Sequence, residues 1–146
     1  QRLPTVAETG RRNGVLVQGD AHARAILPDL VPGAESDWSL EEREPILDVV
    51  IVESLHEAVD HIARYGNGHS ETIVTENRQT ANSFTDFVDA SAVYVNASVR
   101  FTSGAQFGMG ADLGISTDRL HARGPIGIDE ITTYKYIITG NGQTLA

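Results

Sequence analysis

The stretch from Ile46 to Val95 alternates between strand-like and helix-like runs, and this alternation limits the fold more than any other feature. Runs rich in apolar and β-branched residues, at positions 46–52, 72–75 and 92–95, are typical of strands. Two stretches with apolar residues at helical spacing, 55–66 and 77–88, lie between them. Strand–helix–strand units with short connections predict parallel strands and right-handed crossovers. We therefore expect an α/β fold built on a parallel βαβαβ sheet.

Local signals support these boundaries. Ser54 and Glu57 form a capping-box pattern at a helix start, and Gly66 is a typical helix end. The near-continuous run at 46–52 predicts a strand that is buried on both faces. Upstream, we expect a helix ending near residue 12, a strand at 15–17, a helix from Asp20 to about 27, and a loop at 29–39. Residues 1–12 lack a helix start signal, so we expect a chain cut from a longer protein.

Composition excludes several classes of function. The chain has 146 residues and a net charge of −9, which disfavours nucleic-acid and anionic-membrane partners. It has no cysteine, so disulfides, thiolate metal sites and a catalytic thiol supplied by this chain are excluded. No apolar run is long enough to span a bilayer and no secretory signal opens the sequence, so we expect a cytoplasmic protein.

A long polar segment with regularly placed glycines follows the last predicted strand, from Asn96 to about residue 130. Loops of this length in compact domains are usually functional or disordered. Phe101, Phe107 and Met109 lie within it, and a disordered segment tends to lack such residues. We interpret it as an ordered loop that forms a site, because strand carboxyl ends are where parallel sheets bind ligands.

Within this segment the sequence resembles the γ-glutamyl phosphate reductases, also called glutamate-5-semialdehyde dehydrogenases, of the aldehyde dehydrogenase superfamily. The motifs that carry the resemblance are VYVNAS-RF, FGMGADLGIST, LHARGPIG and TTYKY, together with the upstream RYGNGHSETIVTEN and ESLHEAV. The resemblance covers nearly the whole chain, which corresponds to only the C-terminal portion of such a reductase.

The resemblance implies a specific reaction. A cysteine thiolate attacks L-glutamyl 5-phosphate, phosphate leaves, and the thioester accepts a hydride from NADPH to give L-glutamate 5-semialdehyde for proline biosynthesis. The nucleophilic cysteine and most of the NADP-binding region would precede this chain, so the chain alone is expected to be inactive. Residues 1–130 would belong to the catalytic domain, and residues 131–146 would form an oligomerisation strand and tail.

Several residues are candidates for binding the substrate. Arg100 and Arg123 are the first choice, because a guanidinium group matches phosphate and carboxylate oxygens; the alternative is a solvated or ion-paired arginine. Ser98, like its neighbours Thr102 and Ser103, carries a hydroxyl that suits either the same anion or a turn cap.

Three further candidates have structural alternatives. Asn96 follows a strand and suits either substrate or a turn. His121 suits phosphate as an imidazolium, or braces the loop through a ring nitrogen. Phe101 suits either the wall of the substrate pocket or the core.

Glu41 is the candidate for cofactor binding. In the wider superfamily, a glutamate four residues before a proline holds the nicotinamide ribose, and Glu41 stands four residues before Pro45. The alternative is an exposed acidic run. The five histidines show no spacing that requires a metal.

Partners and rival functions complete the expectations. The β-prone run 131–139 predicts an edge strand that pairs with another subunit, so we expect a homo-oligomer. One rival function is a non-catalytic oligomerisation or interaction module with the same fold. Another is a non-phosphorylating aldehyde dehydrogenase, which the FGMGAD and HARGPIG blocks disfavour.

Overall fold

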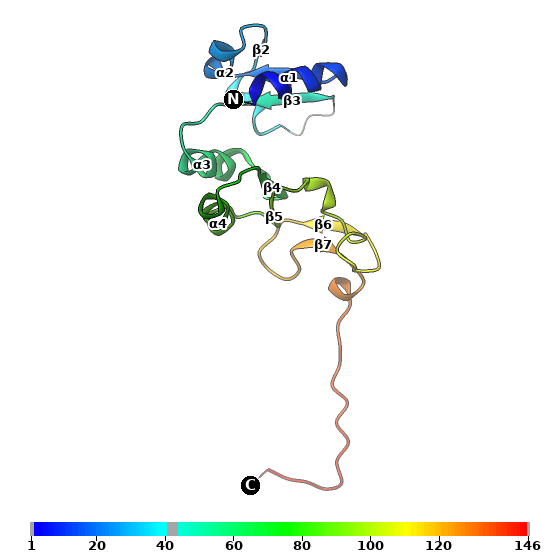
Figure 1. The fold of residues 1–146 in the computed structure, drawn as a ribbon. Helices are drawn as coiled ribbons and strands as arrows, with labels where there is room; N and C mark the ends of the chain where they lie inside the picture. Colours follow the sequence, from blue (N-terminus) through cyan, green and yellow to red (C-terminus); the bar gives the residue numbers. More distant parts are fainter. Residues whose placement is uncertain (1, 41–43, 146) are drawn as a thin grey trace.

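A computed structural model describes residues 2–40 and 44–145 of the chain. Two α/β units follow each other in sequence, and a small hairpin and an extended C-terminal tail come after them (Figure 1). The strands within each unit are parallel, so the predicted α/β class with parallel strands is confirmed.

The first unit contains α1 (Leu3–Arg12), β1 (Leu16–Gly19), α2 (Ala21–Ile26), β2 (Val31–Pro32) and β3 (Ile46–Val49). Its sheet has the strand order β2-β1-β3. Ala7, Val17, Ala23 and Leu30 form its buried core. Asp20 caps α2 as predicted, since its carboxylate accepts a hydrogen bond from the Ala23 N–H at 2.7 Å. Strand β2 lies within the predicted loop 29–39. The sequence did not predict it, because a two-residue strand is too short to show a periodic pattern.

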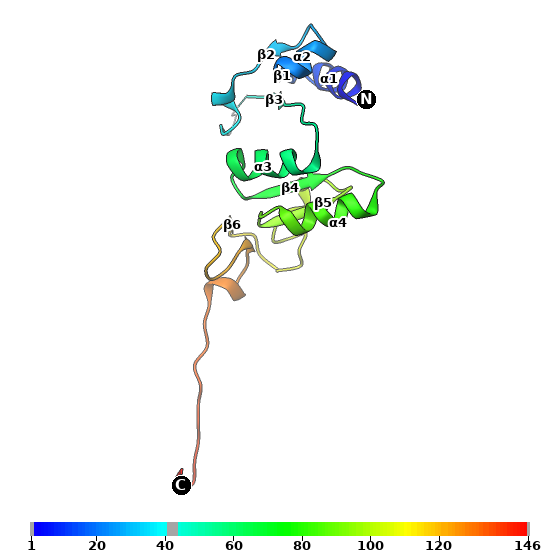
Figure 2. The same cartoon turned by 90° about the vertical axis from the view of Figure 1, so that its left-hand side faces the viewer.

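The second unit contains α3 (Leu55–Tyr65), β4 (Ser70–Ile73), α4 (Arg78–Phe87) and β5 (Ala92–Val95). Ser54 and Asn77 cap the two helices by accepting N–H bonds at 3.1 and 3.0 Å. The Glu57 carboxylate accepts from the Glu53 N–H at 2.8 Å, one residue before the predicted cap amide. Both helices lie on the same face of the β4–β5 pair (Figures 1 and 2).

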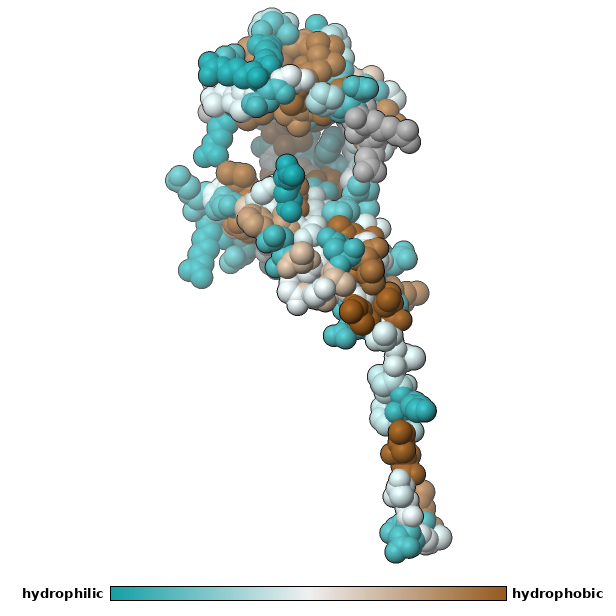
Figure 3. All heavy atoms as spheres, turned by 90° about the vertical axis from the view of Figure 1, so that its right-hand side faces the viewer, coloured by the Kyte–Doolittle hydropathy of each residue, from teal (hydrophilic) through white to brown (hydrophobic). Residues whose placement is uncertain are grey.

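The strands of the two units form separate sheets rather than the expected single βαβαβ sheet. Among the described residues, β3 pairs only with β1, and β4 pairs only with β5. The Pro45 carbonyl accepts a hydrogen bond from Leu16 of β1, and the Val49 carbonyl accepts one from Asp20, the residue after β1. Alternation along the strand therefore turns the peptide groups of Asp48 and Val50 toward the unpaired edge. β4 has an unpaired edge too, and Figure 3 shows a hollow between the two units.

The prediction that β3 is buried on both faces is wrong for the described residues. Leu47 is exposed, and its neighbours in the strand are half-buried. A cavity of about 570 Å³ lies between α1 and β3, and a second, of about 520 Å³, lies between β3 and the end of α3. The run 46–52 is therefore more apolar than its burial among the described residues explains.

An aromatic cluster connects the two units. Trp38 follows the short helix η1 (Glu35–Asp37), and its ring contacts His61 and Tyr65 of α3 with centroid distances of 5.2 and 5.1 Å. The Tyr65 hydroxyl donates to Glu35, which raises the pKa of the tyrosine, and Arg64 pairs with the same carboxylate at 3.0 Å.

The predicted long loop contains regular secondary structure. It starts with the short helix η2 (Val99–Phe101), and its later part forms an antiparallel hairpin of β6 (Gly114–Ser116) and β7 (Gly124–Ile126). The short helix η3 (Asp129–Ile131) ends it.

From residue 132 the chain runs away from the folded units as an extended tail (Figures 1 and 2). Ile131 closes η3, and residues 132–139 pair with no strand in the described part of the chain. The tail side chains are exposed; Ile138, for example, is 90% exposed. No helix among residues 2–40 and 44–145 has the length and apolar character needed to cross a membrane.

Candidate functional site at the carboxyl end of β5

The segment from Asn96 to Thr102, called here the carboxyl-end segment, leaves β5 and crosses β4. Asn96 has a φ of 55°, a left-handed conformation that asparagine tolerates. Its amide accepts from the Thr75 N–H at 2.9 Å and donates to the Thr75 carbonyl at 2.8 Å. The Thr72 hydroxyl donates to the Ala97 carbonyl at 2.9 Å. These bonds tie the start of the segment to β4 and to the residues after it.

The end of the segment is held by Thr102, a buried polar residue with 8% exposure. Its Oγ1 lies 2.7 Å from the Ser70 hydroxyl of β4 and 2.7 Å from the Tyr94 hydroxyl of β5. Ser70 in turn lies 2.8 Å from Nδ1 of His69. These four side chains form a hydrogen-bonded group that we call the hydroxyl chain.

Between these anchors, η2 presents Arg100 and Phe101. Both side chains are exposed, with Phe101 at 53%. Arg100 forms no ion pair with any residue that the structure describes. Ser98 accepts from the Arg100 N–H at 3.2 Å, which is the turn cap of its alternative interpretation. The segment therefore holds a positively charged and an aromatic side chain on an anchored backbone.

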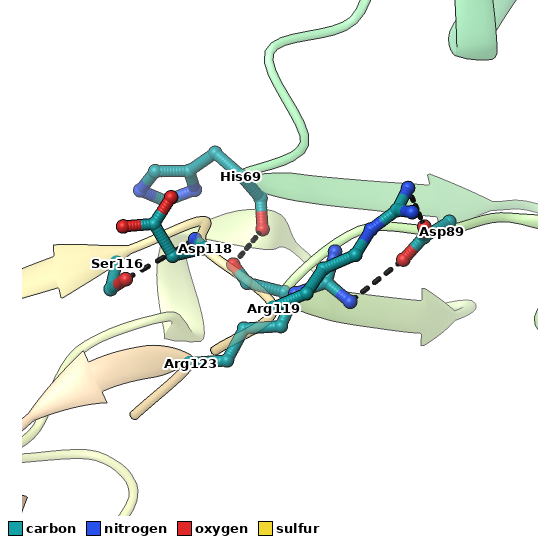
Figure 4. A network of polar contacts seen from close by, with 7 residues as sticks. His69, Asp89, Ser116, Asp118, Arg119 and Arg123 are labelled. Atoms are coloured by element: carbon teal, nitrogen blue, oxygen red, sulfur yellow. Dashed lines mark hydrogen bonds and ion pairs between the residues drawn. The ribbon is translucent and has the colours of Figure 1, made fainter. Parts of the chain in front are cut away.

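Arg123 lies elsewhere, beside the amino ends of β4 and β5. Its guanidinium pairs with Asp89 at 2.7 Å, and Arg119 pairs with the second oxygen of the same carboxylate (Figure 4). Arg123 also lines a cavity of about 280 Å³ between α3, α4 and the hairpin loop, and Arg100 is not among the lining residues. The structure therefore places Arg100 and Arg123 apart, and Arg123 has the ion pair of its alternative interpretation, so substrate binding by either residue stays a prediction.

His121 also acts within the loop. It has a φ of 64°, and its Nε2 lies 3.0 Å from the Glu130 carbonyl, which ties the hairpin loop to η3. This is the bracing role, away from Arg100. Phe101 is exposed, so it is not part of the core that the described residues form. The remaining candidate, Glu41, lies outside the described residues.

Sequence reasoning missed the partners that hold these residues. Asp89 precedes β5 and receives two arginines from the hairpin, and Ser70 and Tyr94 receive Thr102. Serine and tyrosine residues on strands give no sequence signal of such pairing, because the partners are far apart in the chain. Among the residues that the structure covers, no group of histidine, aspartate and glutamate side chains is arranged to hold a metal.

The Asp89 pairing predicts an acid-dependent contribution to stability. The hydrogen bond from Arg123 holds the pKa of Asp89 below its ordinary value of 3.8. A carboxylate with a lowered pKa stabilises the folded state above its unfolded pKa, and this contribution disappears as the pH falls through the folded value. Asp89→Asn should therefore lower the midpoint of urea unfolding at about pH 6 but not at about pH 2.

The matched control for that prediction is Asp86→Asn, which removes an exposed carboxylate of α4 that forms no ion pair with a described residue. It should change the midpoint little at either pH. An Asp89→Asn deficit of the same size at both pH values would contradict the ion-pair explanation.

No family model matches the chain. Curated sequences do match. The chain is 51% identical over 139 residues to a γ-glutamyl phosphate reductase of a Thermotoga species, and 52% identical over 141 residues to that of Clostridium beijerinckii. These matches cover 95% and 97% of the chain but 34% of each relative. The chain thus spans about one third of the length of these relatives.

Solved structures agree. The crystal structure of γ-glutamyl phosphate reductase from Thermotoga maritima matches with a TM-score of 0.91 and 49% identity, over 99% of this chain and 35% of that one. The enzyme of the same name from Saccharomyces cerevisiae matches with a TM-score of 0.52 and 28% identity, over 73% of this chain and 28% of that one. In sequence and in fold, the chain is therefore related to the γ-glutamyl phosphate reductases, of which it spans about one third.

Proposed function

We propose that this chain forms part of the catalytic domain of a γ-glutamyl phosphate reductase, a cytoplasmic enzyme of proline biosynthesis. The full enzyme reduces L-glutamyl 5-phosphate to L-glutamate 5-semialdehyde and releases phosphate. A cysteine thiolate displaces phosphate to form a thioester, and hydride from NADPH then gives the aldehyde and regenerates the thiolate. The thiol and most of the NADP site belong to parts of the reductase outside this chain, so we expect the chain alone to be inactive.

The observation that carries this proposal is the state of Arg100. It is an exposed guanidinium without an acidic partner among the described residues, on a backbone fixed by Asn96 and Thr102. Arg78 is also exposed and without an ion pair, so the feature that distinguishes Arg100 is its position after the carboxyl end of β5, where parallel sheets bind ligands. An anion that comes from outside can pair with Arg100 there, and the phosphate or carboxylate of the substrate fits a guanidinium fork. Arg100 would then hold the anionic group while phosphate leaves.

The test uses a chimera in which this chain replaces the matching third of the Thermotoga maritima reductase. The reverse reaction is measured as NADP⁺ reduction with glutamate 5-semialdehyde and phosphate. We expect activity that requires phosphate, and no activity from the 146-residue chain by itself. A folded chimera without activity, or with equal activity when phosphate is left out, would count against the proposal.

The tail supports a second candidate function, subunit association, which the non-catalytic alternative shares. Tyr134, Tyr136 and Ile138 are exposed on an extended backbone whose peptide groups pair with no strand in the described part. An apolar strand in this state invites pairing with a sheet edge of another copy. Hydrophobic residues along the tail are visible in Figure 3.

Removing residues 132–146 should therefore shift the chain toward monomers. Sedimentation velocity of the full and shortened chains over a range of concentrations is the measurement. The control is the substitution of Asn141 by serine, which keeps the tail. If the full chain sediments as a monomer at high concentration, the tail does not drive association.

A further inference from the structure

We infer that Thr102 is a positioning residue that fixes Arg100 for anion binding through the hydroxyl chain. This inference deepens the proposed function and rests on it. Thr102 ends η2, the turn that carries Arg100 and Phe101, and its N–H donates to the Val99 carbonyl at 3.0 Å. Its side chain is buried and points at β4 and β5, so it cannot serve the anion directly.

The hydroxyl chain has two possible directions of hydrogen-bond donation. Each hydroxyl has one proton, so Thr102 donates to one neighbour and accepts from the other. If Tyr94 donates to Thr102, then Thr102 donates to Ser70, and Ser70 donates to Nδ1 of His69. In the opposite direction His69 donates to Ser70, Ser70 donates to Thr102 and Thr102 donates to Tyr94, whose own proton then has no acceptor among the described residues. In both cases Thr102 is the central member, and its removal leaves Ser70 and Tyr94 each without one partner.

The location of this anchor decides what it controls. The start of the segment is fixed by Asn96 and by the Thr72 bond to Ala97. The Ser98 cap lies inside the segment and moves with it. Thr102 is thus the side chain that ties the far end of η2 to both strands of the second unit. Without it, Arg100 is held from one side only, and its guanidinium loses a fixed position relative to the sheet.

The loss of position has a kinetic signature. If the guanidinium must be ordered when the anion binds, the affinity for the anion is lower before the chemical step begins. The effect is therefore larger on KM than on kcat. In the active chimera, Thr102→Val should raise the KM for phosphate in the reverse reaction about tenfold, with kcat changed by less than about threefold. Thr102→Ser keeps the hydroxyl and should stay within about twofold of the unmodified chimera.

Two further variants make the test independent of the valine variant. Ser70→Ala with Tyr94→Phe removes both partners and leaves Thr102 in place, so it should reproduce the KM increase. Thr85→Val is the control, because it removes a hydroxyl that bonds within α4, at 2.8 Å to the Asn82 carbonyl, far along the chain from η2. It should leave the KM unchanged.

A second readout uses the 146-residue chain without any activity. The amide N–H groups of Phe101 and Thr102 bond to Ser98 and Val99 within η2. In the Thr102→Val chain these amides should exchange with deuterium faster, while the Asn96 amide, bonded to Ile73 at 2.8 Å, should not change.

Unchanged exchange at Phe101 and Thr102 in the valine variant would overturn the inference, as would an unchanged KM in an active chimera. An inactive chimera with the unmodified chain would instead remove the proposed function, and the exchange experiment would still decide whether Thr102 holds η2. Equal KM increases for the serine and valine variants would also overturn it, because they would show that the hydroxyl has no part.

Discussion

In the chimeric reductase, Arg100→Gln will lower kcat/KM for the reverse reaction by about a hundredfold, which corresponds to roughly 2.7 kcal/mol of lost transition-state stabilisation. The physical reason is the loss of a charge-assisted bond to an oxyanion whose charge grows as phosphate leaves. Arg100→Lys keeps the charge but not the planar fork, so it should recover only part of the activity. Steady-state kinetics with varied phosphate measure both.

The control for this prediction is Arg78→Gln, at the start of α4. Arg78 is exposed and forms no ion pair with a described residue, as for Arg100, but it belongs to α4 and not to the carboxyl-end segment. Its loss should change kcat/KM by less than about twofold. If Arg78→Gln and Arg100→Gln have equal effects, Arg100 acts only through the overall charge of the protein.

Phe84→Ala should produce the largest loss of stability. Phe84 is 3% exposed in the middle of α4, where it lies with Ala81 and Val88 against the second unit's sheet. Truncating a buried phenylalanine removes its transfer free energy and leaves a cavity, which together cost about 3–5 kcal/mol. A loss of this size is a large share of the total stability of a small domain. Urea unfolding followed by circular dichroism measures it.

Phe87→Ala provides the comparison on the same helix. Phe87 is 65% exposed, so its truncation should cost less than about 1 kcal/mol. Equal losses for the two variants would mean that α4 does not pack in solution as described.

The second unit was the part of the fold that the sequence predicted best. Strand β5 was predicted at its observed residues, and α3 begins immediately after the predicted cap at Ser54. These elements have local causes, such as β-branched runs and capping side chains. The division of these strands between two sheets was not predictable, because the local sequences of β3 and β4 do not indicate whether the two strands pair with each other. The pairing of β3 with β1 is a long-range choice that no local pattern records.

The site was predicted in part. Arg100, Phe101 and Ser98 lie together on η2, because they are neighbours in sequence and follow a strand. Arg123 and His121 were expected in the same site but belong to the hairpin loop, beside the amino ends of the strands. After Ser103 the chain turns back toward the sheet, and the sequence does not indicate at which end of the strands it arrives. The Asp89 carboxylate, which determines where Arg123 lies, could not be distinguished from other acidic residues.

The unpaired edges of β3 and β4 have a consequence for handling the chain by itself. Each of these edges is a row of unpaired peptide groups, and Leu47 is exposed beside one of them. An extended peptide can hydrogen-bond to such an edge as an additional strand. The extended tail of a neighbouring molecule is one such peptide, so concentrated solutions would drift toward open-ended polymers rather than closed assemblies. Solubility, rather than the intrinsic strength of either core, would then limit how long the isolated polypeptide survives.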